Sequence, residues 1–125
     1  YLAKDERTNR VEIRPQPFQD AIEIHTAYEP LKRSADYTVL KVHLITGKTH
    51  QIRAHLRAIG HPIIGDPKYG RKDANAYYRS HGGVKSQLLH AWELHFPETL
   101  DGPLRNLAGQ TITAEPPKDF RPFLK

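Results

Sequence analysis

The sequence predicts an α+β fold with a mainly antiparallel sheet and a few short helices. Several short segments alternate apolar and polar residues, and one longer segment has the periodicity of an amphipathic helix. Gly and Pro, at 8 and 10 residues, interrupt the chain often. The elements follow in the order β-β-α-loop-β-β-α, which is typical of this class. At 125 residues the chain amounts to one domain or less.

The first strand signals lie before residue 46. Residues 11–13 predict a short strand, and residues 22–28 alternate apolar with polar side chains, as a half-buried strand does. Residues 37–45 are rich in β-formers and predict the next strand. A turn within residues 31–36 would join the last two of these into an antiparallel hairpin.

A helix is predicted from about Thr49 onward. Ile52, Leu56 and Ile59 recur at the spacing that gives a helix one apolar stripe. Thr49 suits the N-cap or the first turn, and Gly60 is well placed to end the helix in the left-handed conformation.

The rest of the chain contains a turn-rich loop and several shorter elements. We expect the loop at residues 61–70, a short helix at 72–80 and a long strand at 87–96. A last strand is predicted at residues 110–114, before two prolines and a short terminal helix.

Positive charge is concentrated in one stretch of the sequence. The chain has a net charge of +5, and residues 41–72 hold seven basic side chains against a single acid, Asp66. Clustered positive charge favours a polyanionic partner, most simply a nucleic acid. A basic surface that only keeps the protein in solution is the alternative.

Several kinds of chemistry lack the residues they need. Cysteine is absent, which excludes disulfides and thiolate chemistry and suits a cytoplasmic protein. His50 and His55 diverge by roughly 140° around a helix, and His90 and His95 would point to opposite faces of a strand, so we expect no metal site. No phosphate-binding loop, nucleophile elbow or segment able to span a membrane is present.

Arg53 is the most informative single side chain. It shares the polar side of the predicted helix with His50 and Arg57, and an arginine held in a cleft can pair bidentately with a carboxylate or a phosphate. An ordinary surface arginine is the alternative. For Asp66, in a Gly-Asp-Pro turn, we favour a structural role in which the carboxylate bonds nearby backbone amides.

Three blocks of sequence resemble the RluA family of RNA pseudouridine synthases. They are residues 46–56 (TGKTHQIRAHL), residues 60–70 (GHPIIGDPKYG) and residues 89–96, and the resemblance covers roughly residues 20–125. It implies a pseudouridine synthase-like fold and an enzyme that isomerises uridine to pseudouridine in RNA. In that reaction the glycosidic bond is cleaved, the uracil rotates and C5 is joined to the sugar, without a cofactor or metal.

The resemblance assigns Arg53 as the ion-pair partner of a catalytic aspartate. In the family that aspartate lies in an H-R-L-D-like motif, which is absent from this sequence. We therefore expect residues 1–125 to be the C-terminal portion of a single catalytic domain, truncated at its N-terminal side, lacking the nucleophile and inactive alone.

The resemblance also implies how RNA is held. Leu89 matches an apolar residue of the uracil pocket, and Lys48, His50 and Arg57 are expected to face RNA phosphates. Ribosomal RNA is the favoured substrate, with transfer RNA as the other candidate. The alternatives are a non-catalytic RNA-binding module of the same fold and, less favoured, a basic domain that contacts proteins.

Overall fold

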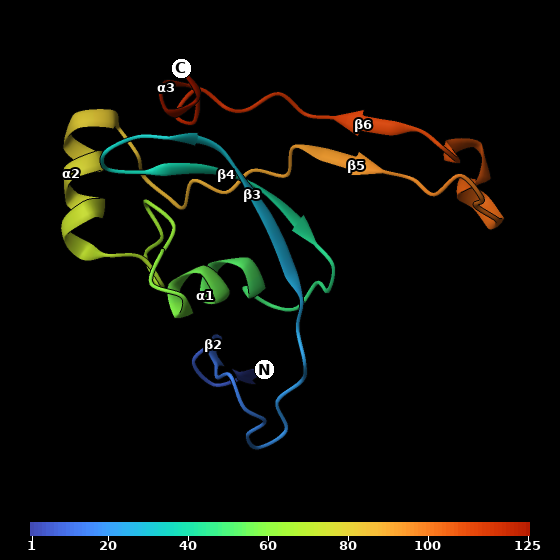
Figure 1. The fold of residues 1–125 in the computed structure, drawn as a ribbon, viewed down its shortest axis with the longest axis horizontal. Coiled ribbons are helices and arrows are strands. Elements are labelled where there is room, and N and C mark those ends of the chain that lie inside the picture. Colours follow the sequence, from blue (N-terminus) through green and yellow to red (C-terminus); the bar gives the residue numbers. More distant parts are fainter.

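The computed structural model describes all 125 residues (Figure 1). Its elements follow in the order β1 (Leu2–Asp5), β2 (Arg10–Ile13), β3 (Thr26–Arg33), β4 (Thr38–Leu44), α1 (Gln51–Ala58), α2 (Lys72–Gly82), β5 (Glu93–His95), the 3₁₀ helix η1 (Gly102–Leu107), β6 (Thr111–Thr113) and α3 (Arg121–Leu124).

All strand pairs are antiparallel, but they do not form one sheet. The strands make three separate two-stranded ribbons, β1–β2, β3–β4 and β5–β6. Between the first two ribbons the chain touches β1 through a single bridge, Leu2 to Ile22. The expected α+β class with antiparallel pairing is therefore confirmed, and every ribbon keeps open edges.

The β3–β4 hairpin forms as expected, with its turn closed by a bond from the Ser34 N–H to the Tyr37 carbonyl, 2.8 Å long. The prediction of a half-buried strand over residues 22–28 is wrong in its detail. β3 begins only at Thr26, and Tyr28 on it is 52% exposed. Local alternation cannot report whether a layer packs against the apolar face, and here that face lacks one.

The predicted helix is α1, and a glutamine fixes its start. The Gln51 Oε1 accepts hydrogen bonds from the Thr46 hydroxyl (2.9 Å) and the Lys48 N–H (3.1 Å). Its Nε2 donates to the His25 carbonyl (3.0 Å), so the buried amide joins the turn before α1 to the start of β3. The N-cap is His50 rather than Thr49, with a φ of 52°. Gly60 follows the helix with a φ of 86°, as expected.

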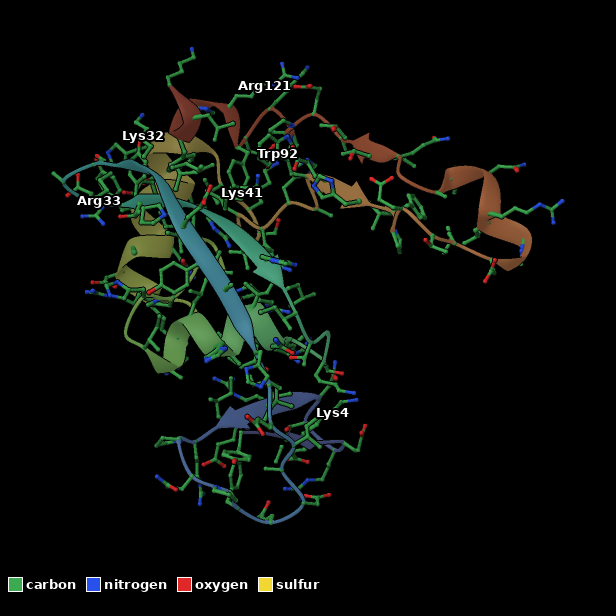
Figure 2. All side chains as sticks on the ribbon, turned by 45° about the vertical axis from the view of Figure 1, so that its right-hand side comes forward. Lys4, Lys32, Arg33, Lys41, Trp92 and Arg121 are labelled. Carbon is green, nitrogen blue, oxygen red and sulfur yellow. The ribbon has the colours of Figure 1, made fainter.

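The later elements are shorter or longer than predicted. α2 extends to Gly82, and the long strand expected at residues 87–96 is reduced to β5, because β6 lies opposite only three of its residues. Figure 1 shows β5–β6 and η1 as an arm that projects away from the rest of the molecule. Lys41 of β4 meets the base of this arm, with its Nζ 5.2 Å from the Trp92 ring centroid and 3.7 Å from Glu93 (Figure 2).

The buried interior consists of two small clusters. The first joins β1, β2 and α1 to the loop before α2, through Leu2, Val11, Ile24, Ala54 and Tyr69. The second joins β4, the residue after α2 and α3, through Val39, Val84 and Phe123. Only 12 of the 125 residues are buried, and large apolar side chains such as Leu94 and Ile112 are half exposed on the arm. Much apolar surface is therefore left without a packing partner.

Candidate functional site

Arg53 and Asp66 form the centre of the candidate site. The Arg53 Nε donates to Asp66 Oδ2 at 2.7 Å, and its Nη2 donates to Oδ1 at 2.9 Å. The Asp66 side chain is fully buried and that of Arg53 is 12% exposed. Such parallel bonds between a guanidinium and a carboxylate fix both the position and the direction of the arginine.

Asp66 also organises its own turn, as the sequence predicts. Its Oδ1 accepts the backbone N–H groups of Lys68 (2.9 Å) and Tyr69 (3.0 Å). Burial on its own raises the pKa of Asp66, but hydrogen bonds from Arg53 and from these two amides outweigh burial and hold the pKa below its usual value. The pairing with Arg53 was missed, and the isolation of Asp66 as the single acid among residues 41–72 was the signal for it.

Two glycines and an asparagine hold this turn against the rest of the chain. Gly65 has a φ of 83°, and a Cβ there would lie 2.1 Å from the Ser86 carbonyl oxygen. A Cβ on Gly70 would lie 2.4 Å from the Asp66 carbonyl oxygen. Asn75 of α2 accepts from the Gly65 N–H (2.7 Å) and donates to the Asp66 carbonyl (2.9 Å). The close backbone approach explains why this loop is rich in glycine.

Tyr69 connects the turn to the first residue before α1. Its hydroxyl accepts the Val11 N–H at 2.9 Å and lies 2.9 Å from His50 Nδ1. Burial, followed by the charges of Arg53 and Lys68, lowers the pKa of His50, although Asp66 acts in the opposite direction. His50 is therefore neutral at pH 7 and can offer an N–H without carrying a charge.

The three polar residues predicted along the helix converge on one loop. Arg53 contacts Asp66, His50 contacts the Tyr69 hydroxyl, and the Arg57 Nη1 donates to the Tyr69 carbonyl at 3.0 Å. Lys48 is exposed in the turn that precedes α1. Leu89 is 41% exposed, and its neighbour Leu88 donates its N–H to the Ile64 carbonyl (2.9 Å), which places that segment beside the loop.

The arrangement has a defined chemical capacity. Asp66 is closed to any ligand because both its oxygens are already bonded and its side chain is fully buried. Arg53 donates through Nε and Nη2, while its Nη1 makes no hydrogen bond within the chain. The free edge of the guanidinium can therefore receive a carboxylate or another oxyanion. No cluster of side chains suited to a metal ion is present, and none of the helices has the length and apolar character to cross a membrane.

Comparison with known proteins adds a family to this geometry. Residues 2–58 match the family model described as RNA pseudouridylate synthase. An uncharacterised RNA pseudouridine synthase of Chloroflexus aurantiacus is 38% identical over 119 residues, which are 95% of this chain and 34% of the relative. The ribosomal large subunit pseudouridine synthase D of Nitrosomonas europaea is 43% identical over 82 residues, 62% of this chain and 23% of the relative.

A second protein of that name, from Haemophilus ducreyi, is 35% identical over 85 residues, 63% of this chain and 26% of the relative. The chain thus spans about a quarter to a third of the length of these curated relatives.

Proposed function

The chain belongs to the RluA-like family of RNA pseudouridine synthases, and we propose that residues 1–125 form the C-terminal portion of one catalytic domain of such an enzyme. The complete domain would isomerise a uridine of RNA to pseudouridine. This chain would supply the arginine that holds the catalytic carboxylate and part of the surface that holds the RNA.

The observation that carries the proposal is the state of Arg53. Asp66 occupies one edge of the guanidinium and aims it, while Nη1 stays available at a side chain that is 12% exposed. A second carboxylate at Nη1 would be ionised and oriented by the charge next to it. Because Asp66 is fully buried, the nucleophilic aspartate would come from outside residues 1–125.

The remaining site residues would contact the RNA. Lys48 is exposed and can meet a phosphate, as can the free donors of Arg57. His50, being neutral, would donate a hydrogen bond rather than form an ion pair. Leu89 would line the uracil pocket, which its exposure and its position beside the loop at Ile64 support. Flipping a base out of a structured RNA costs about a few kcal/mol, which phosphate contacts can offset.

The packing supports the view that further polypeptide completes the domain. Three two-stranded ribbons with open edges and exposed apolar side chains are the surfaces that a larger sheet would cover. We favour ribosomal RNA as the substrate, since two of the relatives are named ribosomal large subunit pseudouridine synthase D.

The test is tritium release from RNA labelled at C5 of uridine, because joining C5 to the sugar releases that hydrogen. The 125-residue chain is compared with a chimaera in which the upstream half of a relative's catalytic domain, with its H-R-L-D motif, precedes Tyr1. We expect release by the chimaera only. Release by the 125-residue chain alone would overturn the assignment of the nucleophile to another segment.

A further inference from the structure

A hollow lies between β2 and α1, beside the candidate site. Its volume is about 220 Å³, and its lining includes Arg10, Val11, Ile13, Ala54, Arg57 and Tyr69. The floor is mostly apolar, and the two guanidinium groups are its positive wall. Tyr69 belongs to both places, because its hydroxyl contacts His50 while its carbonyl contacts Arg57.

Both arginines are tethered to the same stretch of backbone. The Arg10 Nη2 donates to the Lys68 carbonyl at 2.7 Å, and the Arg57 Nη1 donates to the next carbonyl, that of Tyr69, at 3.0 Å. The Arg10 guanidinium carbon also lies 5.2 Å from the Tyr69 ring centroid. Each tether occupies one of the five N–H donors of a guanidinium, so most of the donors stay free in a fixed position.

The charge in the hollow is not neutralised by the protein. Neither Arg10 nor Arg57 forms an ion pair, unlike Arg53, which is held by Asp66. Glu12 also lines the hollow, but Arg14 holds its carboxylate, with Nε 2.6 Å from Oε1. Lys68 adds a further charge at the rim, where its Nζ bonds the Asn9 carbonyl at 2.6 Å. Two fixed guanidinium forks without a carboxylate suit an oxyanion of phosphate geometry.

We propose that this hollow is a subsite for one phosphate group of the RNA backbone, next to the nucleotide held at Arg53. The assignment rests on the proposed RNA-modifying function. The same chemistry would accept a small free phosphate, so the experiment must separate the two sources.

The experiment measures binding of a fluorescent single-stranded RNA decamer to the 125-residue chain over a range of salt concentrations. The double variant Arg10→Gln/Arg57→Gln should bind about tenfold more weakly at low salt, the loss typical of a charged hydrogen bond. Its slope of log affinity against log salt should be smaller by about 0.7, for one phosphate released. Arg79→Gln on α2, which removes an exposed arginine without an ion pair, is the matched control and should leave both quantities unchanged.

A second variant keeps the test decisive where the double variant is unstable. Glu12→Gln removes the one carboxylate of the hollow and should tighten RNA binding severalfold. In a parallel arm, inorganic phosphate is titrated into ¹⁵N-labelled chain, where it should shift the Nε–H signals of Arg10 and Arg57 and be displaced by the decamer.

The outcomes separate the subsite from the function on which it rests. RNA affinity and salt slope that neither the double variant nor Glu12→Gln changes would overturn the subsite alone. Inorganic phosphate that the decamer fails to displace would overturn RNA as the source of the phosphate. A lack of any RNA binding by the unsubstituted chain, even at low salt, would instead contradict the proposed RNA contacts of this chain.

Discussion

Arg53 of α1 and Asp66 of the following loop are joined by two parallel hydrogen bonds of 2.7 and 2.9 Å, and the carboxylate is fully buried. The chain contains a second pair of the same type at the surface. Arg71 and Asp73 are also bonded twice, at 3.3 and 2.9 Å, but their side chains are 69% and 71% exposed. The two pairs differ chiefly in burial, which makes them a natural comparison.

Asp66→Asn is expected to destabilise the protein by about 3 kcal/mol, because it leaves the guanidinium of Arg53 without its counter-charge in a poorly solvated place. Asp73→Asn should cost less than about 1 kcal/mol, as exposed ion pairs usually do. Urea unfolding of both variants makes the comparison. Equal losses would show that the buried pair does not hold the loop onto α1.

Tyr69→Phe removes only a hydroxyl, but it deprives the buried Val11 N–H of its acceptor and His50 of its partner. A loss of about 1–3 kcal/mol in unfolding free energy is expected for the unsatisfied donor. Tyr77→Phe is the matched control, since Tyr77 is 56% exposed and its hydroxyl makes no hydrogen bond in the structure. A loss no greater than that of the control would mean that water satisfies Val11 in place of Tyr69.

Stability should depend on pH in two separate ranges. Burial, Arg53 and Lys68 lower the pKa of His50 in the folded state, and burial lowers the pKa of His55. The unfolded chain then binds protons more readily, so stability is complete above about pH 6.5 and falls as the pH decreases through the folded-state values. The lowered pKa of Asp66 adds a contribution that is lost below about pH 3.9.

Urea unfolding at a series of pH values measures this dependence. His50→Gln should flatten the curve below pH 6.5, whereas His61→Gln should not, because His61 is exposed and its ring makes no hydrogen bond. A curve of unchanged slope in the His50 variant would contradict the neutral state assigned to that histidine.

Two glycines test how the loop is held. Gly60 and Gly65 have φ values of 86° and 83°, but a Cβ on Gly60 would meet nothing within 4 Å, whereas one on Gly65 would lie 2.1 Å from the Ser86 carbonyl oxygen. Gly60→Ala should cost about 1 kcal/mol for the left-handed backbone alone. Gly65→Ala should cost about 2–4 kcal/mol, since the overlap with Ser86 adds to that strain. Similar melting temperatures for the two variants would argue against close packing at Gly65.

The sequence predicts well those features that depend on neighbouring residues. The periodicity of Ile52 and Leu56 locates α1, and Gly60 marks its end, because both signals are local. The β3–β4 hairpin is predicted for the same reason. The side on which Arg53, His50 and Arg57 lie also follows from helical spacing.

The partner of Arg53 could not be predicted in this way. An aspartate in a turn ordinarily bonds nearby amides, and Asp66 does so. Its second role arises because Gly65 packs against Ser86 and Asn75 of α2 bonds both sides of the turn, which places the loop over α1. These are contacts between segments distant in sequence. The division of the strands into three ribbons likewise depends on which surfaces meet, a property that alternation along one strand does not report.

The most direct test of the account is the effect of Arg53 on catalysis in the chimaera that carries the H-R-L-D motif. We expect Arg53→Gln to reduce tritium release from C5-labelled uridine RNA by about 100-fold or more, since the catalytic carboxylate would lose the charge that holds it. Arg53→Lys should restore only part of the rate, because an ammonium group cannot bridge Asp66 and a second carboxylate with the same fork. Arg79→Gln should release tritium at the unsubstituted rate. Full activity in the Arg53→Gln chimaera, with its fold intact by circular dichroism, would contradict the role assigned to Arg53.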